Sequence, residues 1–245
     1  MAGGSDGDTQ KVKHFLNEEL QAPNVLKVAI DPAVARELLP MLERRRLYSK
    51  APAWRSDVKW LSARTERDFA RFQSVFERLD IARHVEPYLD LDRAVRLYSG
   101  FFVVRTRCAE PDFHLDWRDA NNEAFTLLTP LTENSEGFGL LYKRTDGSIG
   151  EYEYKLGEGL IVGDNFVHST KPGASAEPVI LLSFTFGSDK MEHWQNISRT
   201  AARQGLLVCR PDGTFERLPL GKRLRSALGR LARTVGLLRP TRSAY

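Results

Sequence analysis

The sequence predicts a mainly β fold with flanking helices, built as a β-sandwich or a closed jelly roll. Residues 94–187 consist of short β-rich runs, none of them as long as a typical helix. Turn residues separate these runs at regular spacing, which is typical of two facing sheets. Helical periodicity occurs only before and after this stretch. The length of 245 residues suits one substantial domain with additions.

The N-terminal third predicts a disordered leader and two helices. Residues 1–10 are rich in Gly, Asp and Ser, which cannot form a packed core. A helix is expected over 32–42, with Asp31 as its N-cap and Pro32 in its first turn. A second helix is expected over 64–79, where large apolar residues fall on one face. These are Phe69, Phe72, Val75, Phe76 and Leu79. We expect both helices to support a sheet.

The central part predicts seven strands joined by tight turns. We place them at 95–107, 124–131, 138–144, 150–155, 159–163, 165–169 and 178–187. Asp146-Gly147 is a hairpin signal, Gly157 and Gly159 mark the next corner, and Pro172-Gly173 turns the chain before the last strand.

The C-terminal part predicts a helix over 191–203, a hairpin around Pro211-Asp212-Gly213 and a basic amphipathic helix within 219–245. From Arg199 onward, eleven Lys and Arg residues face two acidic ones, a local charge of +9. The rest of the chain carries a net charge of −5. We therefore divide the sequence into the leader, a single domain over 11–198 and a basic tail over 199–245.

The sharpest motif is His114-Leu115-Asp116 at the end of a β-run, followed by His168 in a later β-run. Residues two apart in a strand point to the same face, so the first two side chains can share one ion. Two imidazoles and one carboxylate leave three positions of an octahedral metal open, as a non-haem Fe(II) oxygenase requires. The alternative is that His114 is a packed histidine and Asp116 a surface turn residue.

Residues 95–187 resemble the Fe(II)/2-oxoglutarate-dependent dioxygenase superfamily, in particular its phytanoyl-CoA-hydroxylase-like branch. The resemblance depends on His114 and Asp116, on His168 with the preceding Gly163-Asp164, and on the strand over 179–186. It implies a double-stranded β-helix (jelly-roll) core, an Fe(II) ion held by the three side chains, and consumption of O2 and 2-oxoglutarate. Related halogenases lack the carboxylate, so the presence of Asp116 favours hydroxylation.

The sequence departs from this family at one position. Family members carry an Arg about ten residues after the distal His, which binds the far carboxylate of 2-oxoglutarate, but residues 174–182 contain no basic side chain. A buried carboxylate needs a cation or several donors. Four residues are candidates for this role, with the first ranked highest because some relatives use a Lys from the fourth barrel strand: Lys143, Arg105, Arg107 and Lys171.

The expected function is hydroxylation of a C–H bond in a small or medium-sized metabolite. One alternative is a jelly-roll metalloenzyme that does not use 2-oxoglutarate, either another oxygenase or a cupin-like isomerase. Another is a non-catalytic scaffold whose tail, residues 219–245, binds an anionic membrane surface or a phosphorylated partner. With two distant cysteines and no apolar run long enough to span a bilayer, we expect a cytoplasmic protein, with peripheral membrane binding as an option.

Overall fold

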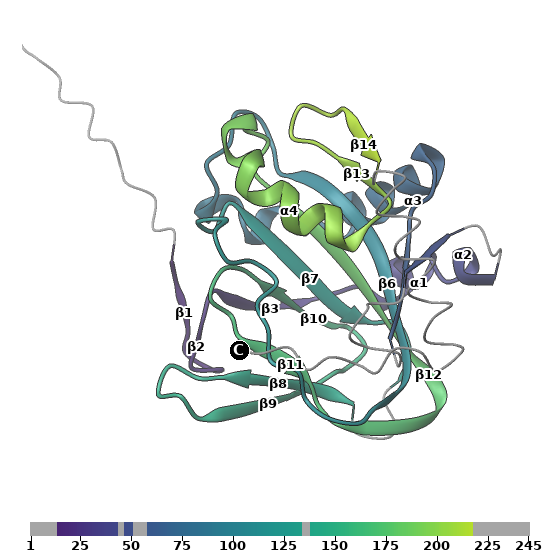
Figure 1. Cartoon of the computed structure of the whole chain (residues 1–245), viewed down its shortest axis with the longest axis vertical. Coiled ribbons are helices and arrows are strands. Elements are labelled where there is room, and N and C mark those ends of the chain that lie inside the picture. The colour runs from purple at the N-terminus through teal and green to yellow at the C-terminus, as the bar shows by residue number, and fades with distance from the viewer. Residues whose placement is uncertain (1–13, 44–46, 51–57, 134–137, 218–245) are drawn as a thin grey trace, which may run out of the picture.

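The computed structural model describes residues 14–43, 47–50, 58–133 and 138–217. Two antiparallel sheets face each other, and most of the helices cover the outer side of the larger one (Figure 1). The predicted leader over 1–10 lies outside the described residues, as does the predicted basic helix within 219–245. The division into a leader, a domain and a tail therefore stays a prediction.

The two sheets have the strand order of a double-stranded β-helix. In order across the larger sheet, the strands are β3 (Val25–Ala29), β10 (Glu158–Val162), β7 (Ala124–Pro130), β12 (Gly173–Gly187), β6 (Arg96–Cys108), β5 (Lys59–Ser62) and β4 (Tyr48–Lys50). The smaller sheet contains β11 (His168–Thr170), β8 (Gly139–Lys143) and β9 (Ile149–Glu153). A backbone bridge between His114 and His168 adds a further segment to the smaller sheet. The predicted jelly-roll core is confirmed.

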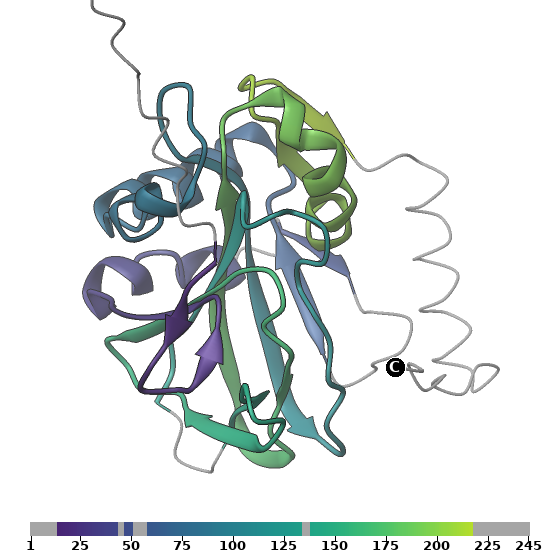
Figure 2. The same cartoon turned by 90° about the vertical axis from the view of Figure 1, so that its left-hand side faces the viewer.

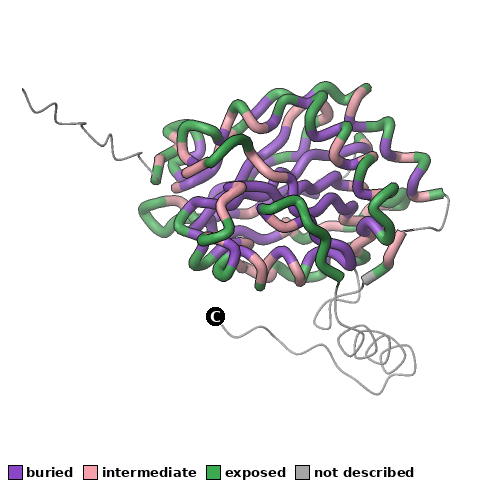
Figure 3. Tube along the Cα trace, turned by 90° about the horizontal axis from the view of Figure 1, so that it is seen from above, coloured by how far each residue is buried: buried purple, intermediate pink, exposed green. Residues whose placement is uncertain are grey.

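Side chains of the long central strands alternate between two apolar layers. On β12, Leu182 and Phe184 pack into the core that contains the helices, whereas Leu181 and Ser183 face the space between the sheets. This alternation follows from the two-residue period of a strand. Because both faces are covered, these strands are apolar on both sides. Buried residues accordingly fill the interior of the molecule (Figure 3).

Helix α3 (Glu66–Arg78) forms the main support of the larger sheet. Thr65 caps it, accepting a hydrogen bond from the Asp68 backbone N–H, while the Asp68 carboxylate accepts one from the Thr65 N–H. The apolar face predicted from the sequence is buried against the sheet, and ring centroids of Phe72 and Phe102 lie 5.3 Å apart. A Cβ at Gly100 would overlap the Phe72 ring, so the glycine allows the helix this close approach.

The helix expected over 32–42 is split. Helix α1 (Pro32–Arg36) begins as predicted, with the Asp31 carboxylate accepting hydrogen bonds from two backbone N–H groups. Helix α2 (Pro40–Glu43) then starts anew. Pro40 has no N–H to donate and disfavours helical geometry at Leu39, which explains the break.

The remaining elements include several that the sequence pattern did not indicate. The strands β3, β4 and β5 were missed, as were the short strands β1 (Leu16–Asn17) and β2 (Ala22–Pro23) and the 3-10 turns η1 (Ala82–His84) and η2 (Glu86–Tyr88). The predicted helix near 191–203 appears as the turn η3 (Met191–His193) followed by α4 (Trp194–Gln204). The predicted hairpin is formed by β13 (Leu207–Cys209) and β14 (Phe215–Arg217).

Helices α1 to α3 lie on one side of the larger sheet, whereas α4 lies on the other (Figure 2). Helix α4 therefore lies on the same side of the larger sheet as the space between the two sheets. Its first residue, Trp194, packs on Tyr98 of β6, with ring centroids 5.4 Å apart. In the described ranges, no helix is long and apolar enough to cross a membrane.

Candidate metal centre and its cavity

The two histidines of the motif are paired directly by their backbones. The His114 N–H donates to the His168 carbonyl at 2.9 Å, and the His168 N–H donates to the His114 carbonyl at 3.0 Å. Cross-strand partners in an antiparallel pair point to the same face. The two imidazole rings therefore lie side by side, with centroids 4.6 Å apart.

Backbone carbonyls fix the proton of each imidazole. Nδ1 of His114 lies 2.7 Å from the Asp112 carbonyl oxygen, and Nδ1 of His168 lies 3.1 Å from the Phe166 carbonyl oxygen. A carbonyl oxygen can only accept, so each Nδ1 carries the proton in the neutral ring. Both Nε2 atoms then keep a lone pair, which is the arrangement found in metal-binding histidines.

Asp116 completes a group of three possible ligands. Its Oδ1 lies 3.8 Å from Nε2 of His114 and 4.0 Å from Nε2 of His168, too far for hydrogen bonds. One nitrogen or oxygen from each residue lies within 4.8 Å of the other two. The three side chains are 40% (His114), 16% (Asp116) and 5% (His168) exposed. The group therefore extends from the protein surface into the interior.

Burial keeps His168 neutral. Desolvation, helped by the neighbouring His114, lowers the pKa of His168 to about 4, although the Asp116 carboxylate acts in the opposite direction. The ring therefore does not form an ion pair with Asp116 at neutral pH. It presents an unprotonated nitrogen beside a carboxylate, and this donor set suits a divalent cation.

The corner before His168 explains the Gly163-Asp164 pair in the motif. A Cβ at Gly163 would lie 2.7 Å from the side-chain oxygen of Asn122, so only glycine fits there. The Asp164 N–H donates to the same Asn122 oxygen, and the Asp164 carbonyl accepts from Asn24. These contacts fix the chain just before it enters β11.

A cavity of about 490 Å³ opens beside the three side chains, between the two sheets. Apolar residues from three strands form part of its wall: Leu128 of β7, Leu140 of β8 and Leu181 of β12. Its volume lies within the ordinary range of small-molecule sites. The structure therefore combines a possible metal centre with room for ligands.

Of the four cationic candidates, Arg105 alone lines the cavity. Arg107 is exposed on the same strand. Lys171 forms an exposed ion pair with Glu151, with 2.6 Å between Nζ and Oε2. Lys143, ranked first from the sequence, is exposed and lies over the ring of Phe113, 6.0 Å from its centroid. Lys143 follows an inward-facing Tyr142 on β8 and therefore points away from the cavity.

Arg105 pairs across the sheet with the last barrel strand, β12. Its Cα is the register partner of Val179 on β12, where regular pairing resumes after the irregularity that follows Ala174. Cross-strand partners share a face, and Val179 is buried between the sheets. Arg105 thus lies on the strand next to residues 174–182, the stretch that contains no basic side chain.

Several cavity residues carried no signal in the sequence. Tyr154, which follows β9, lines the cavity and is 5% exposed. Burial raises the pKa of Tyr154, Arg105 opposes that shift and Asp116 adds to it, so all three groups are electrostatic neighbours. The Ser183 hydroxyl is fully buried and has no hydrogen-bond partner in the part of the chain that the structure describes.

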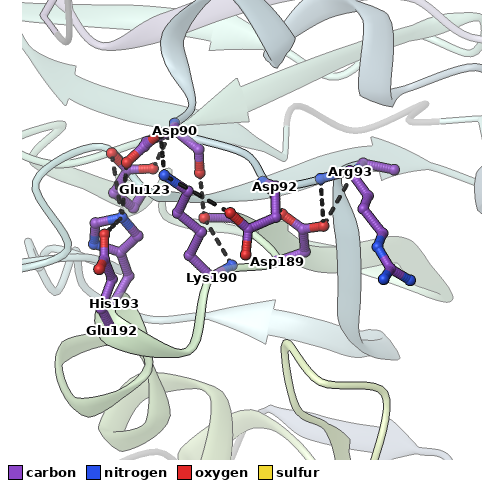
Figure 4. Close-up of polar contacts among 10 residues, drawn as sticks. Asp90, Asp92, Arg93, Glu123, Asp189, Lys190, Glu192 and His193 are labelled. Carbon is purple, nitrogen blue, oxygen red and sulfur yellow. Dashed lines mark hydrogen bonds and ion pairs between the residues drawn. The ribbon is translucent and has the colours of Figure 1, made fainter.

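A second group of possible ligands lies at the start of α4: Asp90, Glu192 and His193 (Figure 4). Nε2 of His193 lies 3.6 Å from Oδ2 of Asp90 and 3.5 Å from Oε1 of Glu192. However, Nζ of Lys190 lies 2.7 Å from Oδ1 of Asp90, and this contact lowers the Asp90 pKa. An ammonium group already pairs with Asp90, so we interpret this cluster as a structural network that fixes the chain entering α4.

Several solved structures have a similar architecture. HygX from Streptomyces hygroscopicus, with nickel and 2-oxoglutarate bound, matches with a TM-score of 0.50 and 14% identity, over 71% of this chain and 88% of HygX. EvdMO1 matches with a TM-score of 0.50 and 15% identity, over 67% of this chain and 47% of EvdMO1. An oxidoreductase of the 2OG-Fe(II) oxygenase family from Burkholderia pseudomallei has a TM-score of 0.48 and 12% identity, over 67% and 84% of the two chains.

The chain has the fold of the 2-oxoglutarate-dependent Fe(II) oxygenases. No family model matches the sequence, and no curated protein matches it either. At these identities the likeness concerns the oxygenase fold and does not specify a branch, so the phytanoyl-CoA-hydroxylase-like assignment stays a prediction. The roles of individual residues in this oxygenase fold follow from the site itself.

Proposed function

We propose that the protein is an Fe(II)- and 2-oxoglutarate-dependent oxygenase that hydroxylates a small molecule. The observation that supports this most directly is the convergence of His114, Asp116 and His168 at the mouth of a cavity inside an oxygenase fold. The same fold serves other reactions, so the proposal depends on these side chains and not on the architecture alone.

His114, Asp116 and His168 would hold the iron. The donor set fits, because two imidazoles whose Nδ1 atoms are bound by carbonyl oxygens direct their Nε2 atoms toward one carboxylate, and the backbone bridge fixes both histidines. When bound, Fe(II) together with 2-oxoglutarate and O2 supplies the oxidation of a substrate C–H bond. The protein provides the ligands, the position of the substrate and the exclusion of water.

Arg105 and Tyr154 would bind the far carboxylate of 2-oxoglutarate. Both line the cavity, and each influences the electrostatic surroundings of the other. A guanidinium binds a carboxylate through two parallel hydrogen bonds, and a buried phenol adds a donor. Leu128, Leu140 and Leu181 line the same cavity and would limit the access of water to the bound carboxylate.

The experiment is an assay of 2-oxoglutarate turnover without added substrate. Purified protein should convert 2-oxoglutarate to succinate only when both Fe(II) and O2 are supplied, and a chelator should stop the reaction. His114→Ala should reduce turnover to background while the variant stays folded. Turnover that persists after chelation, or in His114→Ala, would rule the proposal out. Iron binding without any 2-oxoglutarate consumption would favour the alternative of a jelly-roll metalloenzyme with another cosubstrate.

A further inference from the structure

The cavity has two ends, and strand β6 runs from one to the other. Phe101, Val103 and Arg105 of β6 all line the cavity, whereas Ser99, two residues before them on the same face, lies against Gly205 at the end of α4. Six residues of extended chain span about 20 Å. The proposed cosubstrate anchor Arg105 therefore lies far from the end of the cavity that α4 closes.

Helix α4 contributes a polar wall at its own end. Thr200, Arg203 and Gln204 line the cavity, and their spacing of three and four residues places them on one face of the helix. Gln204 is 8% exposed, and its side-chain oxygen has no hydrogen-bond partner among the described residues. A buried amide oxygen without a partner costs about 1–3 kcal/mol, unless a ligand donates a hydrogen bond to it.

An aromatic surface adjoins this polar wall. Trp60 of β5 is paired with Val103 of β6 and lines the cavity, and its ring packs edge-on against Phe101 with centroids 6.3 Å apart. Flat apolar walls of this kind bind rings and other apolar groups of a ligand. The α4 end thus offers an apolar surface beside a cation and an amide.

The two ends of the cavity differ in the charged residues that line them. The acidic residues in the cavity wall, Asp112 and Asp116, both belong to the segment that carries the metal ligands. At the α4 end, the charged residue that lines the cavity is Arg203. The two arginines of the cavity wall, Arg105 and Arg203, therefore lie toward opposite ends of the cavity.

Helix α4 is held firmly enough to act as a binding wall. Lys190, four residues before the helix, is bound to Asp90, and the Asp189 carboxylate accepts hydrogen bonds from the backbone N–H groups of Asp92, Arg93 and Ala94 (Figure 4). The buried Tyr98 hydroxyl donates to the Ser188 carbonyl. These contacts fix the chain just before α4 and with it the position of Arg203 and Gln204.

We propose that this end of the cavity is the substrate subsite and that it takes an anionic small molecule. Its carboxylate or phosphate is bound by Arg203, a hydroxyl or amine of the same molecule donates to the Gln204 side-chain oxygen, and its apolar part packs on Trp60 and Phe101. The proposal rests on the proposed function, since it names the substrate class of the same cavity. A guanidinium supplies parallel N–H donors to such an anion.

The test is calorimetric titration of nickel-loaded, full-length protein saturated with 2-oxoglutarate, so that the cosubstrate end is filled and turnover is prevented. The probes are 3-phenylpropanoate, phenyl phosphate and the neutral 3-phenylpropanamide. At least one anion should bind about tenfold or more tighter than the amide, as expected for a charge-assisted hydrogen bond. Which anion binds better distinguishes a carboxylate from a phosphate substrate.

Three variants locate the binding. Arg203→Gln should abolish the preference for the anion, and Gln204→Glu should do the same by adding a negative charge. Arg199→Gln changes an exposed arginine on α4 outside the cavity wall and should leave the preference intact. Equal binding of anion and amide, no binding of any probe, or a preference that survives Arg203→Gln would each overturn the proposal.

A separate titration with 2-oxoglutarate distinguishes the two proposals. Arg105→Gln should weaken 2-oxoglutarate binding, whereas Arg203→Gln should not. If 2-oxoglutarate fails to bind the wild-type protein but the Arg203-dependent preference is present, the proposed function fails and the anion subsite stands. If 2-oxoglutarate binds normally and no preference is seen, only the subsite fails.

Discussion

His114 and His168, which are 54 positions apart in the sequence, exchange two backbone hydrogen bonds of 2.9 and 3.0 Å. This bridge fixes the distance and the direction of both imidazoles before any ion binds. A site held in this way loses little conformational entropy on binding, which favours tight and specific coordination. The bridge also explains why the smaller sheet is needed: β8 pairs with β11 and supports it from the other side.

Removal of either histidine should abolish iron binding. We expect His114→Ala and His168→Ala to weaken Fe(II) binding by more than about 100-fold, because even loss of an outer contact to a metal ligand costs 10- to 100-fold. The measurement is anaerobic titration followed by metal analysis. The matched control is His193→Ala in the cluster around Asp90, which should keep full iron content. Loss of iron in the control alone would place the metal at the start of α4.

Arg105 should determine the affinity for 2-oxoglutarate. Arg105→Gln removes the cation that faces the buried carboxylate, at a cost of about 2–5 kcal/mol, and should weaken binding at least about 30-fold. Iron content should not change. Lys143→Gln, at the exposed position on β8, is the control and should bind 2-oxoglutarate like the wild type. The reverse pattern would move the anchor to Lys143.

The metal-free protein should lose stability in acid because of His168. Its pKa is about 4 in the folded state, against about 6.5 in the unfolded chain. Between these values the unfolded chain takes up a proton that the folded protein does not. The stabilisation is therefore complete above about pH 6.5 and is lost as the pH falls through about 4, by an amount on the order of 3 kcal/mol.

Urea unfolding of the metal-free protein at about pH 7 and about pH 4.5 measures this effect. In His168→Gln, which cannot be protonated, the difference in unfolding free energy between the two pH values should be smaller by most of that amount. An equal difference in both proteins would mean that His168 is not buried as described.

Gly100 should be required for the packing of α3 on the sheet. A methyl group there would overlap the Phe72 ring, so Gly100→Ala should lower the free energy of unfolding by about 1–3 kcal/mol. Phe72→Leu makes room, and the double variant Gly100→Ala/Phe72→Leu should be more stable than the sum of the two single effects predicts. Strict additivity would show that the two residues are not in contact.

The β-rich core and the convergence of the candidate metal ligands could be predicted because their signals are local. Short runs of β-forming residues with glycine turns mark each barrel strand, and the H-x-D spacing by itself places His114 and Asp116 on one face. The strands β3 and β5 were missed because they are short and lie toward the edges of the larger sheet. Their pairing with β10 and β6 depends on tertiary contacts that no local pattern reveals.

The cosubstrate anchor and the α4 wall could not be predicted from the sequence. On β6, apolar residues occupy both faces around Val103 and Val104, so alternation does not show that Arg105 points inward. The helix that carries Arg203 was expected, but its position over the cavity depends on the contacts that precede it, such as the ion pair of Lys190 with Asp90. The positions of Arg105 and Arg203 relative to the H-x-D motif in the sequence did not indicate the role proposed for either residue.

The central claim is that one ion is held by three side chains, and anomalous X-ray scattering tests it most directly. Crystals grown with Fe(II) under anaerobic conditions, measured at the iron edge, should show a single strong peak about 2.0–2.2 Å from Nε2 of His114, Nε2 of His168 and a carboxylate oxygen of Asp116. A peak beside His193, or no peak near the cavity in crystals that contain stoichiometric iron, would contradict the account.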